Sequence, residues 1–276
     1  MSQGTTFGSW ESPRPVFALE PSVDPMDDDV YSSAYTREPT ADGHGAHLMF
    51  AGIYHRLSSK VDVQLVTSGA PLPLVGRLVY RLPLSNSHMP FAADGELWSR
   101  TETRSVIAAS ERADYGMIFA FPNLVALDEQ TWGLPFIGQY EQHDWGARVP
   151  APRPPDWRWA TWKPHRLTAL EAENEGRVTL VERTCAGAEL RLNYQAAAEG
   201  GSVRVELVEP PRSHPDRLPP VHALDGFSLA EAEPLRGDEV SAVVRWVGRS
   251  DLSALAGRPV AVRLHLVRAK VFAAAW

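Results

Sequence analysis

Residues 202–208 read SVRVELV, and residues 261–269 read AVRLHLVRA. Apolar residues alternate with mostly charged or polar ones, at Val203, Val205 and Leu207 in the first stretch and at Val262, Leu264 and Leu266 in the second. A period of two is typical of a β-strand with one buried face and one solvated face. Strands of this kind build antiparallel β-sandwiches, so we predict a sandwich for the C-terminal part of the chain.

Further strands are expected along most of the sequence. Its 23 prolines and 20 glycines leave little room for long helices and favour short strands. One stretch, LTALEAENE at 167–175, has helical propensity but is short and lies between alternating segments. An aromatic, less regular set of strands is expected at 30–37, 46–55, 61–67, 74–80, 104–109, 116–121, 123–127 and 131–138. A regularly alternating set is expected at 157–162, 165–170, 177–183, 188–194, 202–208, 241–247, 259–267 and 270–275.

A proline-rich segment separates the two sets. Residues 149–157 read VPAPRPPDW, with four prolines. Such a segment is stiff and extended, which is typical of a linker between domains. We therefore predict an all-β protein with two domains, residues 1–148 and residues 149–276.

Composition excludes several classes of protein. The chain has 276 residues, of which 44 % are hydrophobic and 22 % are charged, as in ordinary globular proteins. The net charge is −7 and there is no basic tract, so we expect no nucleic-acid partner. No apolar run approaches the roughly 20 residues of a membrane helix, so we expect no membrane span. The N-terminus lacks the basic start and apolar core of a signal peptide, and the compartment stays unassigned.

Motifs for nucleophilic or cofactor chemistry are missing from the sequence. The single cysteine, Cys185, has no evident histidine partner, and there is no G-x-S-x-G elbow. No histidines or carboxylates have the spacing of metal ligands, and no glycine-rich loop for phosphate is present. We therefore expect neither a metal nor a cofactor.

The C-terminal part contains motif residues that resemble a known family. They are Gly226-Phe227-Ser228, Gly237-Asp238, Trp246, the stretch SDLSALAGRP at 250–259, and Ala269-Lys270-Val271-Phe272. Through them, residues 157–276 resemble the last domain of bacterial glycoside-hydrolase-like proteins. In that family a five-bladed β-propeller, of the kind shared by glycosidase families 32, 43 and 62, precedes a β-sandwich. One departure is Ala232, where relatives often carry cysteine.

The upstream part resembles the late blades of the same propeller. The matching stretches are FGSW at 7–10, DVY at 29–31, LMFAGIYHR at 48–56, VDVQL at 61–65, GMIFAFPNLVAL at 116–127 and WGLPFIGQYEQH at 132–143. A complete propeller needs roughly 250–300 residues, far more than precede the sandwich here. The resemblance therefore implies a partial propeller of two or three blades, with the chain as the C-terminal part of a longer relative. An open propeller edge predicts self-association. A start codon upstream of Met1 would instead give a longer, active protein.

The resemblance also implies where catalytic carboxylates would lie. Glycosidases use two of them, one as acid and one as nucleophile or base. Asp29 would open the innermost strand of a blade, although an aspartate in the acidic run 27–29 is also typical of a turn. Glu96 is a candidate for the acid or is a loop residue, and Asp114 competes for the same role. A departure at 67–72, TSGAPL, removes the Arg, Asp and Trp that relatives have in that turn.

Further positions, including Asp114, are candidates for sugar contacts. Tyr31 is either a platform for a sugar ring or part of the blade packing. His55 and His143 are either donors to sugar hydroxyls or ordinary loop histidines. The tryptophans Trp157, Trp159 and Trp162 are either a stacking platform or the seal of a domain junction, and the second interpretation is favoured.

Together these observations predict a glycoside-hydrolase-like protein that hydrolyses or binds carbohydrate. The alternative is a non-catalytic carbohydrate-binding or purely structural β-module, which the missing blades and the altered turn favour. The sequence does not identify the sugar, the linkage or the stereochemical outcome of a reaction.

Overall fold

The computed structural model describes residues 17–19, 22, 24–40, 46–68, 98–100, 105–109, 115–143, 153–180, 182–210 and 222–276. Every regular element in these segments is a β-strand, apart from one 3-10 turn at Ser253–Leu255. The prediction of an all-β protein is therefore confirmed. The described part contains no helix that is long and apolar enough to cross a bilayer. The chain divides into two compact units, and Trp162 and Lys163 lie on either side of the division.

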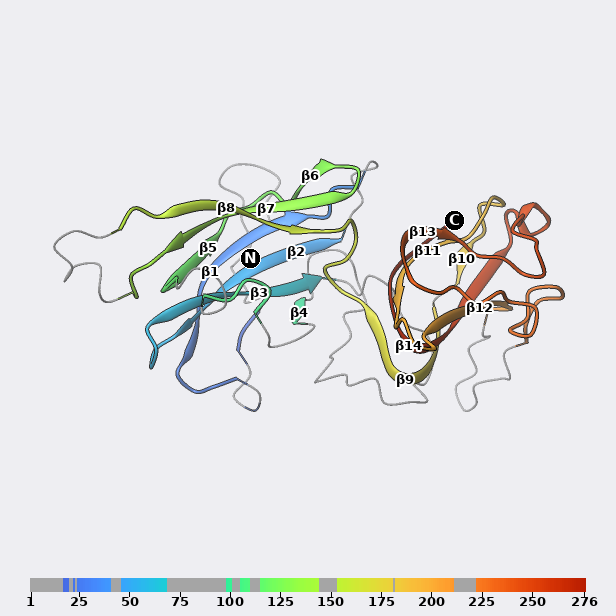
Figure 1. The fold of residues 1–276 in the computed structure, drawn as a ribbon, viewed down its shortest axis with the longest axis horizontal. Coiled ribbons are helices and arrows are strands. Elements are labelled where there is room, and N and C mark those ends of the chain that lie inside the picture. Colours follow the sequence, from blue (N-terminus) through green and yellow to red (C-terminus); the bar gives the residue numbers. More distant parts are fainter. Residues whose placement is uncertain are drawn as a thin grey trace, which may run out of the picture. The chain divides into compact units, whose positions relative to one another are not determined.

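The first unit is built on a curled eight-stranded sheet (Figure 1). Its strands are β1 (Asp28–Arg37), β2 (His47–His55), β3 (Lys60–Ser68), β4 (Trp98–Arg100), β5 (Met117–Ala120), β6 (Val125–Asp128), β7 (Thr131–Gln139) and β8 (Asp156–Trp162). Strands β1 to β4 pair antiparallel in sequence order, and β7 pairs antiparallel with β5, β6 and β8. A single parallel pair, Val61 with Met117, joins the two groups.

Strand β2 lies inside the first unit because both of its faces are covered. On one face Met49, Ala51 and Ile53 form a buried cluster with Val66, and Phe17, Leu19 and Trp98 pack against it. On the other face Phe50 is fully buried and stacks on Trp162 of β8, with ring centroids 6.0 Å apart. Burial on both faces explains why LMFAGI is continuously apolar and does not alternate.

Strand β8 differs from the prediction. We expected residues 157–162 among the strands of the second domain, but β8 pairs with β7 from Trp132–Trp162 to Gly138–Asp156. The prolines of the expected linker end at Pro155, directly before this strand. Because proline cannot donate a backbone hydrogen bond, pairing with β7 begins only at Asp156.

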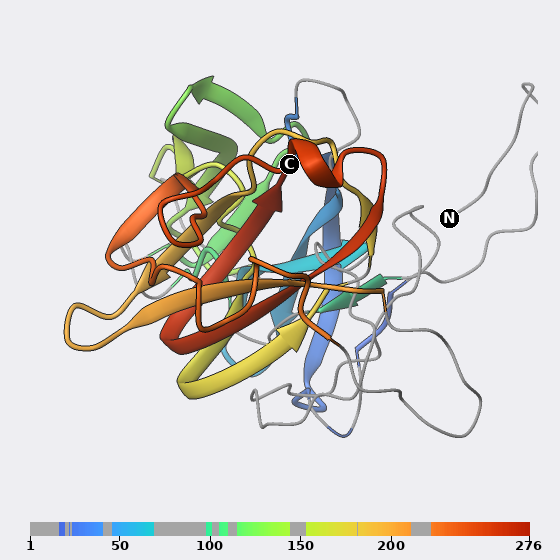
Figure 2. The same cartoon turned by 90° about the vertical axis from the view of Figure 1, so that its right-hand side faces the viewer.

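The second unit is organised around its longest strand, β14 (Pro259–Ala275). The other strands are β9 (Leu170–Thr179), β10 (Arg183–Thr184), β11 (Arg191–Ala196), β12 (Ser202–Val208) and β13 (Asp238–Val243). Four of them, β9 to β12, pair directly with β14, which Figure 2 shows in red. At Arg268 the backbone takes a positive φ of 42°, and beyond this point β14 pairs with β11 in place of β12.

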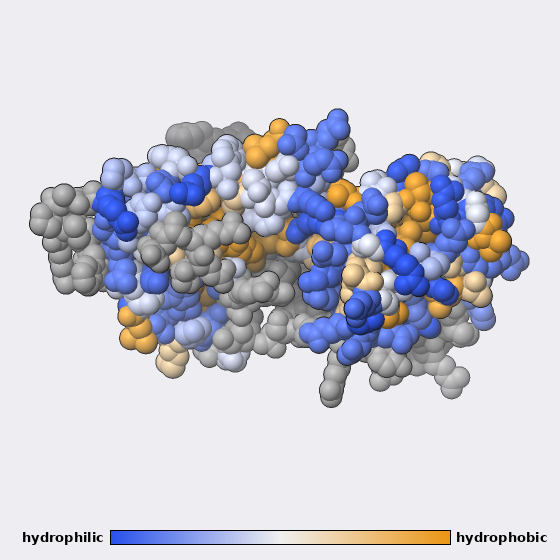
Figure 3. Space-filling view, viewed as in Figure 1, coloured by the Kyte–Doolittle hydropathy of each residue, from blue (hydrophilic) through white to orange (hydrophobic). Residues whose placement is uncertain are grey.

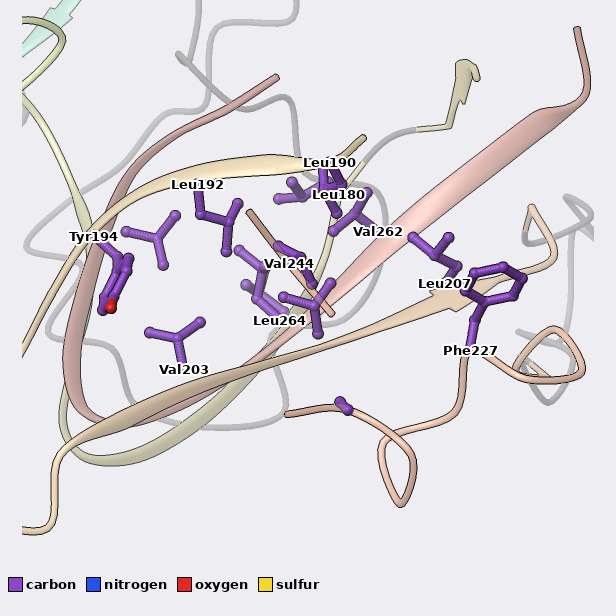
Figure 4. Packing of buried hydrophobic residues seen from close by; sticks show 14 of the residues in the cluster. Leu180, Leu190, Leu192, Tyr194, Val203, Leu207, Phe227, Val244, Val262 and Leu264 are labelled. Atoms are coloured by element: carbon purple, nitrogen blue, oxygen red, sulfur yellow. The ribbon is translucent and has the colours of Figure 1, made fainter. Parts of the chain in front are cut away.

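The alternation predicted for the second unit separates a core from a polar face. Val203, Val205 and Leu207 are fully buried and pack with residues of β11 and β14 (Figure 4). Hydrophilic residues cover much of the described surface seen in Figure 3. Between the core positions of β12, Arg204 is exposed, but Glu206 is buried and pairs with Arg263 at 3.0 Å. A buried carboxylate needs such a partner because desolvation penalises its charge.

Motif residues of the second unit have structural roles. The indole Nε1 of Trp246 donates a hydrogen bond to the carbonyl of Val205 at 2.8 Å, inside the core. The ring of Phe227 meets Trp246 edge to face. Gly226 precedes Phe227 with a φ of 82°, which glycine adopts without a steric penalty. Phe227 and Trp246 therefore both belong to the core of the second unit.

Candidate functional site

An aromatic cluster lies where β1 begins and β2 ends. Tyr31 packs against Tyr54 of β2, Phe119 of β5 and His143 after β7, with ring centroids 5.9, 6.0 and 5.1 Å away. The Tyr31 hydroxyl and Nε2 of His143 are 2.8 Å apart. We call Tyr31, Tyr54, Phe119 and His143 the Tyr31 cluster. The structure thus brings together two predicted sugar contacts, Tyr31 and His143.

Local irregularity in the chain positions this cluster. The register of β1 against β2 shifts between Val30 and Ser32, which makes Tyr31 a bulged residue. Bulges redirect a side chain, and Tyr31 remains 47 % exposed. His143 is held by its backbone N–H, which donates to the carbonyl of Ser59 in the β2–β3 turn at 3.0 Å.

Asp29 lies beside the cluster and forms an ion pair. It is the cross-strand partner of Tyr54 in the β1–β2 register. Its Oδ2 accepts hydrogen bonds from Nε and Nη2 of Arg56 at 2.6 and 2.5 Å. The Asp27 carboxylate accepts from the backbone N–H of Leu57 at 3.2 Å and helps to hold the same turn. The predicted catalytic residue is therefore a partly exposed carboxylate with one oxygen bound to a guanidinium.

His55 belongs to a different group on the opposite face of the sheet. Adjacent residues of a strand point to opposite faces, so His55 points away from the side of its neighbour Tyr54. Its Nδ1 lies 2.7 Å from Oδ1 of Asp28 on β1, and its Nε2 lies 3.6 Å from Oδ2 of Asp62 on β3. The predicted contact His55 is therefore separated from Tyr31 and His143.

Neighbouring charges and hydrogen bonds favour the charged forms of His55 and Asp62. Asp62, and then Asp28, raise the pKa of His55 to about 9, although burial opposes the shift. Burial also works to raise the pKa of Asp62, but His55, the Ala109 amide and the Ser105 hydroxyl together hold that pKa below its usual value. The amide and the hydroxyl donate to Asp62 at 2.6 and 3.1 Å. This arrangement links three neighbouring strands and is that of a structural ion pair.

A third polar group, which sequence reasoning missed, surrounds Asp156 at the start of β8. Its Oδ2 accepts hydrogen bonds from the hydroxyls of Tyr115 and Tyr140 at 2.7 and 2.9 Å, and from Arg158 at 2.9 Å. These donors, with Tyr115 first, lower the pKa of Asp156 to about 2. Burial and Asp156 raise the pKa of Tyr115 to about 12. No local motif connects residues 115, 140 and 156, so the sequence offered no signal for this group.

The tryptophans around β8 have different environments. Trp162 packs on Phe50 in the core, whereas Trp157 and Trp159 are 69 % and 51 % exposed. Trp157 stacks on Phe121, with ring centroids 5.1 Å apart and planes 19° from parallel. Trp157 and Trp159 therefore contribute exposed aromatic surface to the first unit.

Two predicted residues, Glu96 and Asp114, lie outside the described residues. Among those that are described, no group of three or more His, Cys, Asp or Glu side chains could hold a metal ion. Cys185 is buried in the core of the second unit.

In chemical terms the Tyr31 cluster is suited to binding. It offers an exposed ring, an imidazole, a phenol and a neighbouring carboxylate–guanidinium pair within one end of the sheet. Comparisons of the chain with protein-family models, with curated proteins and with solved structures found no match.

Proposed function

We propose that this is a carbohydrate-binding protein of glycoside-hydrolase-like type, and that it binds sugar at the Tyr31 cluster. The observation that supports this most strongly is the pairing of an exposed tyrosine ring with a histidine 2.8 Å from its hydroxyl, next to Asp29. This pairing unites residues that the family resemblance implies as sugar contacts. Tyr31 and His143 are 112 residues apart in the sequence.

The chemistry of sugars fits these side chains. A pyranose or furanose ring has an apolar face of C–H groups and an edge of hydroxyls. An aromatic ring packs on the apolar face, and its own polar end remains available for hydrogen bonds. The imidazole, the carboxylate and the guanidinium can bind the hydroxyls, which fix the orientation of the ligand.

The proposal extends to the assignment of the strands to propeller blades and a sandwich. We infer that β1–β4 and β5–β8 are two neighbouring blades of a partial propeller, and that the second unit is the sandwich. Two features support this assignment. Each group of the first unit is antiparallel within itself, and in the described residues Val61–Met117 is the one strand pairing between them. In the second unit, β14 passes from β12 to β11 at Arg268, as strands do at the corners of packed sheets.

The contacts of Asp29 with Arg56 favour a binding site over a hydrolytic one. Glycoside cleavage needs two carboxyl groups, with one of them able to act as an acid. Oδ2 of Asp29 already accepts two hydrogen bonds from Arg56. The carboxylates Asp28 and Asp62 face His55 on the other side of the sheet. The described carboxylates therefore favour a binding site.

The test uses a control that the chain itself provides. Tyr35, on the same strand, is 42 % exposed, and its hydroxyl lies 2.9 Å from Nδ1 of His47. We would measure binding of fructose, arabinose, xylose and their disaccharides by isothermal titration calorimetry. Tyr31→Ala and His143→Ala should each weaken binding at least about tenfold, a loss of about 1.4 kcal/mol. Tyr35→Ala should leave affinity unchanged.

Two results would overturn the proposal. One is the absence of binding to all of these sugars by a folded sample. The other is an equal effect of Tyr31→Ala and Tyr35→Ala. Reporter β-fructosides, arabinosides and xylosides test for hydrolysis in parallel, and turnover that Asp29→Asn abolishes would establish an enzyme.

A further inference from the structure

Strands β6 and β8 and the residue after β5 present exposed or partly exposed apolar side chains that do not belong to the Tyr31 cluster. Trp157 and Trp159 are alternate residues of β8 and therefore point to the same side. Both are more than half exposed, and Leu127 of β6 is 45 % exposed. Phe121 stacks beneath Trp157. We call Phe121, Leu127, Trp157 and Trp159 the tryptophan face.

The neighbouring strand supports this face. Gly133 of β7 is the cross-strand partner of Thr161 and lies on the same side as Trp159. A Cβ atom on Gly133 would come within 2.9 Å of a ring carbon of Trp159 and 2.6 Å of a methyl carbon of Leu127. A larger residue at position 133 would push both side chains aside, because such distances are shorter than van der Waals contact. Glycine therefore leaves room for the exposed side chains.

Charge indicates the kind of ligand. All four side chains of the tryptophan face are uncharged. The nearest charged residues on β8 are Asp156 and Arg158, which alternate with the tryptophans and pair with each other at 2.9 Å. Because alternate residues of a strand point to opposite sides, neither charge of β8 lies on the tryptophan face, whose chemistry suits a neutral ligand with flat apolar surfaces.

Spacing indicates the size of the ligand. Alternate residues of a strand lie roughly 6.5–7 Å apart along its axis. One sugar ring covers one indole, so a ligand that engages both rings has to extend over more than one sugar. We propose that the tryptophan face binds a chain of neutral sugars. The choice of carbohydrate rests on the proposed function, but none of the four residues of the tryptophan face belongs to the Tyr31 cluster.

The main experiment is affinity electrophoresis of the full chain in gels that contain a soluble neutral polysaccharide: a β-fructan, an arabinoxylan or a β-glucan. At least one of them should retard the protein. Trp157→Ala and Trp159→Ala should each reduce the retardation constant about tenfold. Thr161→Ala is the matched control, since Thr161 is an exposed residue of the same strand and face, and it should have no effect. Circular dichroism verifies that each variant is folded.

A calorimetric series with oligosaccharides of one to six units of the retarding polymer tests the spacing. The affinity of the unmodified protein should rise by at least about tenfold from one unit to three, and the double variant of Trp157 and Trp159 should not show this rise. Tyr31→Ala should lower affinity for the single sugar but preserve the rise. If the proposed function fails, Tyr31→Ala leaves the affinity for the single sugar unchanged. If the proposed function holds and only the present inference fails, the tryptophan variants leave the rise in affinity with ligand length unchanged.

Three results would overturn the inference. The first is the absence of retardation by every neutral polysaccharide. The second is retardation by acidic polygalacturonate alone, which would indicate a cationic site. The third is a change from dimer to monomer on Trp157→Ala in size-exclusion chromatography with light scattering, which would identify the face as a contact between two copies of the chain.

Discussion

His55 is held between two carboxylates that come from the neighbouring strands β1 and β3. Because these carboxylates raise its pKa from 6.5 to about 9, the folded protein binds a proton that the unfolded chain releases. The stabilisation is fully present below about pH 6.5 and is lost as the pH rises through 9. After allowance for screening by solvent, its size is on the order of 1–2 kcal/mol.

The test compares the unmodified protein with His55→Gln by urea denaturation at several pH values from 6 to 10. The difference in the free energy of unfolding should be largest at pH 6 and should shrink towards pH 10. A difference that is constant over this range would show that the proton on His55 makes no contribution.

The residues of the candidate site were only partly predictable. Asp29, Tyr31 and His143 stood out because short stretches around them resemble family motifs. Tyr54 and Phe119 lie within quoted stretches but looked like ordinary strand residues. The partners Asp28 and Asp62 of His55 were missed because they depend on the register between strands, which a single sequence does not reveal.

At the level of elements, the regular alternation in β12 and β14 predicted their buried faces correctly, because one face of each meets a core. Strand β9 shows the opposite case. Its segment LEAENE has helical propensity, but pairing with β14 forces it to be extended. Tertiary pairing thus overrides local preference. Strand β8 was assigned to the wrong set because its tryptophans alternate equally well in either sheet.

Strand β7 contains a close contact that can be tested by substitution. A Cβ atom on Gly138 would lie 2.6 Å from ring carbons of Tyr115, whose hydroxyl donates to Asp156. Gly138→Ala should therefore displace the ring and lower the free energy of unfolding by about 1–3 kcal/mol. The measurement is chemical denaturation followed by tryptophan fluorescence.

Gly176→Ala on β9 serves as the control, because the added carbon would meet only the Cβ of Ala172, at 3.2 Å. Its effect should be below about 1 kcal/mol. Equal losses of stability in the two variants would contradict the packing argument for Gly138.

For the whole molecule, unpaired sheet edges predict self-association. Within the described part of the first sheet, β1 pairs only with β2 and β8 pairs only with β7. Exposed edges can pair with another chain, and the net charge of −7 opposes this approach. Salt shortens the range of the repulsion, from about 10 Å at 0.1 M to about 3 Å at 1 M.

The weight-average mass in sedimentation equilibrium should therefore rise with protein concentration, and the rise should be steeper in high salt. A sample that stays monomeric at every salt and protein concentration would rule out the prediction. An effect of salt in the opposite direction would indicate attraction between charges in place of strand pairing.

The central position of β14 has a consequence for biosynthesis. Strands β9, β10, β11 and β12 precede it by roughly 50 to 90 residues, yet each relies on it as a hydrogen-bonding partner. On the ribosome these four segments leave the exit tunnel before their common partner has been translated. Nascent chains of this protein therefore spend a period with unpaired strand edges and apolar strand faces open to chaperones, and a stalled ribosome would prolong that period.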